Sequence, residues 1–250
     1  GDIQAAFFSN ATQGAIEGQY MIAGQLAMRS AGFEEIPIVN VENACASGST
    51  AFNLACTQLR AGESEVVIAV GAEKMYTPDK EKSMAVLSGA WDVHGVHEVV
   101  SNLERLAANF ELPSETPDSA QRSVFMDVYA ALAKQHMRRF GTTQRQLATV
   151  AAKNHHHSVA NPLAQYRTDY TVDDVLAART IAWPLTLPMC SPISDGAAAA
   201  ILCTGSALRR FERKRAVRVH ACALASGSGR DAEDLQAHIC RRAAQSAYER

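Results

Sequence analysis

The order of apolar segments in the first 73 residues constrains the fold more than any other feature. Residues 5–8 and 37–44 are short apolar or β-branched runs typical of strands, whereas residues 14–30 and 47–60 carry apolar or small side chains at helical spacing. The sequence EVVIAVGAE at 65–73 is a continuous apolar run of the kind that forms a strand covered on both faces. This order of strand, helix, strand, helix, strand predicts a layered α/β fold with parallel strands.

A more polar stretch, residues 77–184, interrupts this pattern, and we interpret it as an insertion into the α/β core. Within it, the segment ELPSETPDSAQR at 111–122 indicates a loop or a short helix. Residues 123–140 carry a helical stripe of apolar side chains, and Gly141 marks its end. The insertion is therefore predicted to combine loop or short-helix segments with a longer helix at 123–140.

A further helix is predicted to begin at Thr143. Thr143 and Gln146 have the spacing of a capping box, in which each side chain satisfies an otherwise unpaired amide of the first turn. The dipeptide Asn161-Pro162 follows, and a residue before proline disfavours helical geometry. The helix should therefore end before residue 161.

Three segments are predicted after the insertion. Small and then branched residues at 197–205 indicate a covered strand that returns to the first core. Residues 216–229 resemble one more strand that ends in a glycine-serine loop, and residues 231–250 indicate an amphipathic helix with acidic residues in its first turn. Asp195, which precedes the returning strand, is interpreted as a residue that caps and orients that strand rather than as a catalytic acid.

Composition and charge exclude several classes of protein. The formal net charge is −2, and the one basic run, residues 208–218, has no accompanying platform of aromatic side chains, so we expect no nucleic-acid partner. No apolar stretch is long enough to cross a bilayer. The 6 cysteines are scattered, which favours a reducing compartment. We expect a cytoplasmic protein, with a peroxisomal location as the alternative.

Cys45 is the first candidate for chemistry, because it falls between a predicted strand and a predicted helix in the sequence VENACASGST. A thiol is a nucleophile only as thiolate, and the amides and dipole of a helix N-terminus lower the pKa of a nearby thiol. The small residues that follow allow a substrate to approach the backbone, and the Cys45 amide could donate to an oxyanion. The alternative is a buried structural thiol, which is how most free cysteines behave, and spacing leaves both open.

The remaining candidates give weaker signals. Consecutive residues His155, His156 and His157 point about 100° apart on a helix, so they cannot converge on one ion, and we predict no metal site and no resident cofactor. One of them could act as an acid or base, but their role stays open. Cys190 could approach Cys45, and a disulfide between the two also stays open, because its geometry cannot be checked from sequence.

Three blocks of the sequence resemble the thiolase family. The segment NVENACASGSTAFNLACTQLRAGESEVVIAVGAEKM resembles the nucleophile region of thiolases, and the blocks KNHHHSVANPLAQYR and PLTLPMCSPISDGAAAAIL are similar to the sterol-carrier-protein, or lipid-transfer, branch. The resemblance implies a layered αβαβα thiolase fold of two similar halves. It also implies this organisation: a partial N-terminal core at 1–76, an inserted loop domain at 77–184, a return strand and helix at 185–215, and the start of the second half at 216–250.

The resemblance also implies an activity. Cys45 would accept the acyl group of a 3-oxoacyl-CoA, and coenzyme A would be a co-substrate that takes the acyl group away. This implies thiolytic breakdown of a fatty acid or sterol side chain by a homodimer. Alternatives are a condensing enzyme, either a biosynthetic acetyl-CoA acetyltransferase or a ketoacyl synthase, and a non-catalytic lipid-binding or scaffold subunit. We expect the activating base and the second cysteine of the family to be absent from these residues, so that the segment alone is inactive.

Overall fold

The computed structural model describes residues 1–90, 92–107, 124–231 and 233–250. The chain divides into two compact units, one formed by Gly1–Val86 and Ser194–Arg250 and the other by Leu87–Ile193. Within the described ranges, no helix is both long and apolar enough to cross a membrane. The first unit contains a four-stranded sheet, and the second contains a two-stranded sheet.

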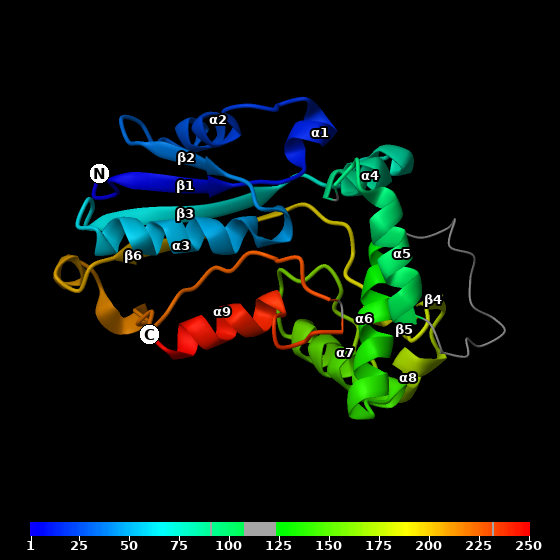
Figure 1. Ribbon diagram of the computed structural model, residues 1–250. Helices are drawn as coiled ribbons and strands as arrows, with labels where there is room; N and C mark the ends of the chain where they lie inside the picture. The colour runs from blue at the N-terminus through cyan, green and yellow to red at the C-terminus, as the bar shows by residue number, and fades with distance from the viewer. Residues whose placement is uncertain (91, 108–123, 232) are drawn as a thin grey trace. The chain divides into compact units, whose positions relative to one another are not determined.

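The first unit contains a four-stranded sheet in the order β2-β1-β3-β6 (Figure 1). Its strands are β1 (Ala5–Ser9), β2 (Ile38–Val41), β3 (Val66–Glu73) and β6 (Gly196–Cys203). β1 pairs in parallel with both β2 and β3, which confirms the predicted strand-helix alternation. The returning strand β6 runs antiparallel to β3, so the sheet is mixed.

Two helices cover opposite faces of this sheet. Phe7 of β1 packs with residues of α3 (Ser47–Arg60), and Phe8 packs with Met28 of α2 (Ala23–Ser30). Successive side chains of a strand point to opposite faces, so neighbouring residues of β1 enter two different apolar clusters. All of β1 is buried as a result. The fold thus has the helix-sheet-helix layering expected from the sequence.

The predicted single helix over residues 14–30 is wrong. The structure has α1 (Gln13–Glu17) and α2, and the chain between them is not helical. Gly18 ends α1 with a φ of 82°, and Ile22 has a φ of 53° directly before α2. Both values lie in the left-handed region, which a right-handed helix cannot continue through.

The returning strand β6 forms where predicted, but it is not covered. Ile201 is 67% exposed, and most of the strand is exposed, whereas Leu202 is buried. β6 lies at one end of the described sheet, and β3 is its neighbour there. The apolar composition of a strand therefore predicted its existence and not its burial.

The last part of the chain differs from the prediction in two ways. Residues 216–229 form no strand: the Cys222 carbonyl accepts hydrogen bonds from the side chains of Asn53 and Arg250, not from a neighbouring strand. The C-terminal helix is shorter than predicted: α9 spans Ile239–Tyr248. Asp234 accepts hydrogen bonds from local amides in a turn before it, and such bonds compete with helix formation. Residue 232, within the predicted helix, lies outside the described residues.

The second unit contains the two helices that the sequence predicts, α6 (Val124–Phe140) and α7 (Gln144–Val159). Helix α5 (Val96–Ala107) packs against α6, and α7 packs against α8 (Val172–Ala177) (Figure 1). The capping box at Thr143 and Gln146 is present at the start of α7, and Gly141 follows α6. The predicted loop or short helix at 111–122 lies outside the described residues.

Its elements are η2 (Ser88–Ala90), α5 (Val96–Ala107), α6 (Val124–Phe140), α7 (Gln144–Val159), α8 (Val172–Ala177), β4 (Thr180–Ala182), β5 (Leu185–Thr186) and η4 (Leu187–Met189). In the first unit, the short elements α4 (Lys80–Leu87), η5 (Ala207–Arg210) and η6 (Arg213–Arg215) complete the described structure.

Candidate active site

The structure places Cys45 on the turn that joins β2 to α3. β2 ends at Val41, a single 3-10 turn η1 (Ala44–Ala46) follows, and α3 begins at Ser47. The Cys45 side chain is exposed and its thiol is free. The position is therefore that of an accessible thiol at the start of a helix, where backbone amides lack partners inside the helix.

The backbone of this turn has an unusual geometry. Ala44 has a φ of 44°, which a residue with a side chain rarely adopts. The buried Ser47 hydroxyl accepts a hydrogen bond from the Asn43 amide at 2.8 Å and donates one to the Ala44 carbonyl at 2.7 Å. The Glu42 carboxylate accepts one from the Ala44 amide at 2.6 Å. These side chains hold the strained residue next to Cys45 in place.

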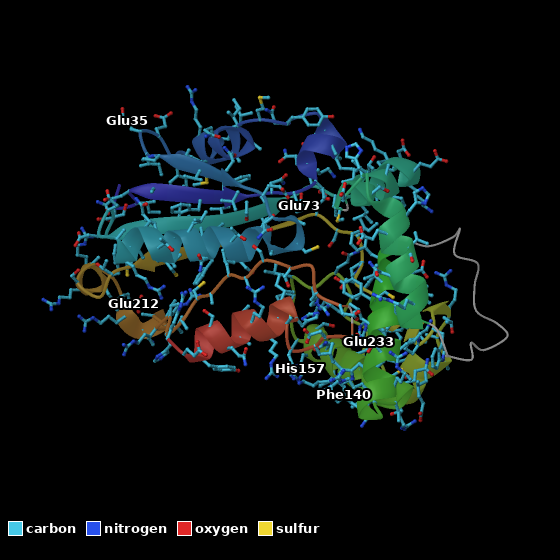
Figure 2. All side chains as sticks on the ribbon, in the orientation of Figure 1. Glu35, Glu73, Phe140, His157, Glu212 and Glu233 are labelled. Carbon is cyan, nitrogen blue, oxygen red and sulfur yellow. The ribbon has the colours of Figure 1, made fainter. Side chains whose placement is uncertain are left out.

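A second group of polar contacts lies at the carboxyl end of β3. Glu73, labelled in Figure 2, ends β3. Its carboxylate accepts hydrogen bonds from the backbone amides of Ala11 and Thr12, both at 3.0 Å. It also accepts one from the Thr12 hydroxyl at 2.7 Å and one from the Asn10 side chain at 3.0 Å. The carboxyl ends of parallel strands meet at one edge of a sheet, so this network lies at the end of the sheet from which the Cys45 turn also emerges. Glu73 was not among the residues predicted from the sequence. The signal that could have found it is the polar residue at the end of each of two neighbouring strands: Asn10 follows β1, and Glu73 ends β3.

Asp195 lies at the same end of the sheet, since its neighbour Gly196 pairs with Glu73. Its carboxylate accepts hydrogen bonds from the Lys74 ammonium at 2.5 Å and from the Tyr76 and Met75 amides at 2.8 Å. These donors, the Lys74 ammonium first, lower the pKa of Asp195 to about 2. The Asp195 carboxylate therefore binds two backbone amides and one ammonium group, contacts that suit the predicted orienting role.

The three consecutive histidines point to different partners. The Nε2 atom of His155 lies 2.9 Å from the Pro188 carbonyl oxygen, and its ring meets Tyr170 edge to face, whereas the Nδ1 atom of His156 lies 3.1 Å from an Asp169 carboxylate oxygen. His157 is exposed (Figure 2). In the part of the chain that the structure describes, no three His, Cys, Asp or Glu side chains are grouped to hold a metal ion. The structure thus offers no metal centre at this triplet.

The other cysteines are free as well. Cys56, in the interior of α3, is buried, and burial raises the pKa of Cys190. No disulfide joins Cys45 to Cys190, the pairing that the sequence had left open. Cys45 therefore differs from Cys56 and Cys190 in its exposure and in its place at a helix start.

A comparison with protein families identifies the fold and the lineage. The family described as Thiolase, N-terminal domain, matches residues 1–174. The chain belongs to the thiolase family. The thiolase match includes the Cys45 turn and the whole of α3, so the resemblance noted from the sequence is confirmed.

Curated thiolase relatives cover most of the chain but only part of their own length. Acetyl-CoA acetyltransferase of Methanothermobacter thermautotrophicus is 36% identical over 228 residues, which are 91% of this chain and 52% of that protein. Sterol carrier protein 2 of Bos taurus is 34% identical over 193 residues, which are 77% of this chain and 33% of that protein. This thiolase chain therefore spans about half, or less, of the curated relatives that it matches.

A solved structure supports the thiolase-like fold. The Ltp2-ChsH2(DUF35) aldolase superposes with a TM-score of 0.60 at 20% sequence identity, over 95% of this chain and 55% of that one. At this identity the likeness concerns the fold alone. It confirms a mixed α/β, thiolase-like architecture that corresponds to roughly half of the larger protein.

Proposed function

We propose that this chain carries the acyl-accepting part of an acyltransferase of the thiolase family, with Cys45 as the nucleophile. The observation that carries the proposal is the exposed Cys45 thiol on the strained turn between β2 and α3. A helix start stabilises nearby negative charge, and the surrounding side chains fix the turn, so the sulfur is held ready to attack a thioester substrate.

The proposed chemistry proceeds through an acyl-enzyme. The Cys45 thiolate attacks the 3-keto carbonyl carbon of a 3-oxoacyl-CoA, and the adjacent carbon–carbon bond breaks. The departing enolate takes up one proton, equivalent to the one that the thiol gave up, and leaves as acetyl- or propionyl-CoA. The acyl group then remains on the sulfur as a thioester until the thiol of coenzyme A accepts it. The backbone amide of Cys45 is the proposed donor to the oxyanion formed in each step.

Two groups of relatives support two different substrate classes for the proposed acyl transfer. Likeness to sterol carrier protein 2 supports the cleavage of lipid or sterol-derived acyl chains. Likeness to an acetyl-CoA acetyltransferase supports transfer of an acetyl group, in which the condensing direction would use the same cysteine. Product analysis with a short and a long 3-oxoacyl-CoA, each with and without coenzyme A, distinguishes the two.

The decisive experiment is mass spectrometry of the intact parent protein that contains this chain, after incubation with an acyl-CoA. We expect one acyl group on the Cys45 peptide and none after Cys45→Ala. Cys240→Ala is the matched control, because Cys240 is the other exposed cysteine, and its removal should leave the adduct intact. An unmodified Cys45 peptide in the wild-type protein would sink the proposal.

The organisation around this reaction is also a proposal. We infer a homodimer that pairs through an edge of the sheet, such as β2, whose neighbour in the described sheet is β1. Light scattering of the purified protein tests this, and a monomer at micromolar concentration contradicts it.

The proposed location is a reducing compartment, the cytoplasm or alternatively the peroxisome. We assign residues 77–184 to the inserted loop domain of a thiolase half.

A further inference from the structure

Two other cysteines, Cys56 and Cys222, pack in the same apolar region of the first unit. The side-chain amide of Asn53 on α3 donates to the Cys222 carbonyl at 3.2 Å and lies 3.4 Å from the Cys222 sulfur. Cys56 is three residues after Asn53 on α3, and residues at this spacing share one face of a helix. Asn53 therefore holds the Cys222 sulfur over the face of α3 that carries Cys56.

Packing gives the same placement independently. Cys56 belongs to the buried apolar cluster between α3 and the sheet, and Cys222 is a partly buried residue packed against that cluster. Both thiols are free. The pKa of Cys56 is raised, first by burial and then by the charge of Cys222, with a smaller hydrogen-bond contribution from the same thiol, whereas the Arg60 guanidinium acts in the opposite direction. The apolar cluster and the Asn53 contacts thus place Cys222 beside the part of α3 that carries Cys56.

We propose that Cys56 and Cys222 form a reversible disulfide in the presence of a small disulfide such as oxidised glutathione. Cys222 is the more exposed of the two, so its thiolate attacks one sulfur of the small disulfide and releases one small thiol. The Cys56 thiolate then attacks the Cys222 sulfur of the mixed disulfide and releases the second small thiol. The two cysteines are oxidised, the small disulfide is reduced to two thiols, and the cysteine protons end on those thiols.

The bond would have a structural consequence. It would join the middle of α3 to segment 216–229, which has no helix or strand of its own and contacts α3 through the Asn53 hydrogen bonds. A cross-link between residues so far apart in sequence restricts the unfolded chain, so the oxidised protein should unfold at a higher temperature than the reduced protein. The site is thus a redox-dependent clamp on the helix that follows Cys45.

The test uses the purified protein in buffers with graded ratios of reduced to oxidised glutathione. After acid quenching and alkylation, we expect a peptide pair cross-linked through Cys56 and Cys222, with a single midpoint and full reversal by dithiothreitol. The exposed Cys45 and Cys240 should carry glutathione in the same samples, which shows that the probe reached the protein. Glutathione on these two cysteines with Cys56 and Cys222 still alkylated separately would overturn the proposal.

Three variants test whether the cross-link is specific to Cys56 and Cys222. Cys222→Ser should abolish the cross-link and leave Cys56 as a free thiol, whereas Cys203→Ser, which removes another partly exposed cysteine of the same unit, should retain it. Asn53→Ala should slow cross-linking several-fold, because the Cys222 sulfur loses its donor. A cross-link that survives Cys222→Ser with another cysteine as partner would assign the bond elsewhere. The readout is a covalent bond and not acyl transfer, so this proposal and the role of Cys45 succeed or fail separately.

Discussion

Cys45 and Cys56 are only eleven residues apart, but the Cys45 thiol is exposed to solvent and the Cys56 thiol is buried. Cys45 stands just before α3, at the polar end of the sheet, which we define by the hydrogen-bonded side chains of Glu42, Ser47, Glu73 and Asp195. Cys56 stands in the interior of the same helix, against the apolar face of the sheet. The comparison shows that one helix places one cysteine in an exposed position at its start and another in a buried position in its interior.

The largest expected difference between the two sites is in alkylation rate. We expect iodoacetamide to modify Cys45 at least about 100-fold faster than Cys56 in the native protein, because Cys56 requires local opening before the reagent can enter. Time-resolved peptide mass spectrometry measures both rates in one sample, and labelling in denaturant provides the control in which the rates converge. Comparable native rates would remove the distinction on which the comparison depends.

A smaller effect is expected when the polar end loses one hydroxyl. Ser47→Ala removes a buried hydroxyl together with its two hydrogen bonds, one from the Asn43 amide and one to the Ala44 carbonyl, so the free energy of unfolding should fall by about 2 kcal/mol. Ser49→Ala is the matched control, because Ser49 is exposed on the same helix and its loss should change little. Urea unfolding of the two variants measures the difference. Equal stability would show that the turn does not depend on the Ser47 hydroxyl.

Truncation of the two cysteines should affect stability in the reverse order of their reactivity. Cys56→Ala removes a buried sulfur from a packed cluster and should cost about 1 kcal/mol of unfolding free energy. Cys45→Ala removes an exposed atom and should stay within about 0.5 kcal/mol of the wild type. The same urea experiment applies under reducing conditions. A larger loss for Cys45→Ala would mean that its thiol packs against the turn.

The smallest effect concerns acidity at the polar end. The pKa of Asp195 is about 2 in the folded protein, below the value of about 3.9 for an unperturbed aspartate. Its contribution to stability is therefore present above pH 4 and is lost as the pH falls from about 4 to 2. Asp195→Asn should weaken the acid dependence of unfolding in this window only, and Asp2→Asn is a control with an exposed carboxylate. An unchanged acid profile in Asp195→Asn contradicts the assignment.

The sequence predicted the parts of the fold that local pattern determines. The strands β1 and β3, the helix α3 and the capping box of α7 follow from apolar periodicity and capping chemistry within a few residues. The position of Cys45 at a strand-to-helix turn followed from the same periodicity. These features depend on residues that are close together in the chain.

Features that depend on distant partners were not predictable in the same way. The exposure of β6 depends on which strands lie beside it, and within residues 216–229, which form no strand, the Cys222 carbonyl accepts a hydrogen bond from the distant Asn53 side chain. Glu73 gains its role from amides that come more than sixty residues earlier, in the 10–12 segment. The contact of Cys222 with α3 spans 169 residues from Asn53, a separation at which local sequence carries no signal.

The antiparallel pairing of β6 with β3 has a consequence for the length of the chain between them. Glu73, at the end of β3, lies opposite Gly196, at the start of β6, so the chain departs from the sheet and rejoins it at adjacent points. Residues added or deleted between Glu73 and Gly196 leave the strand lengths and the pairing register unchanged, because the two ends of the connecting segment keep their positions. The sheet can therefore accept insertions or deletions of different length between Glu73 and Gly196, and relatives can differ in length there while they keep the same sheet.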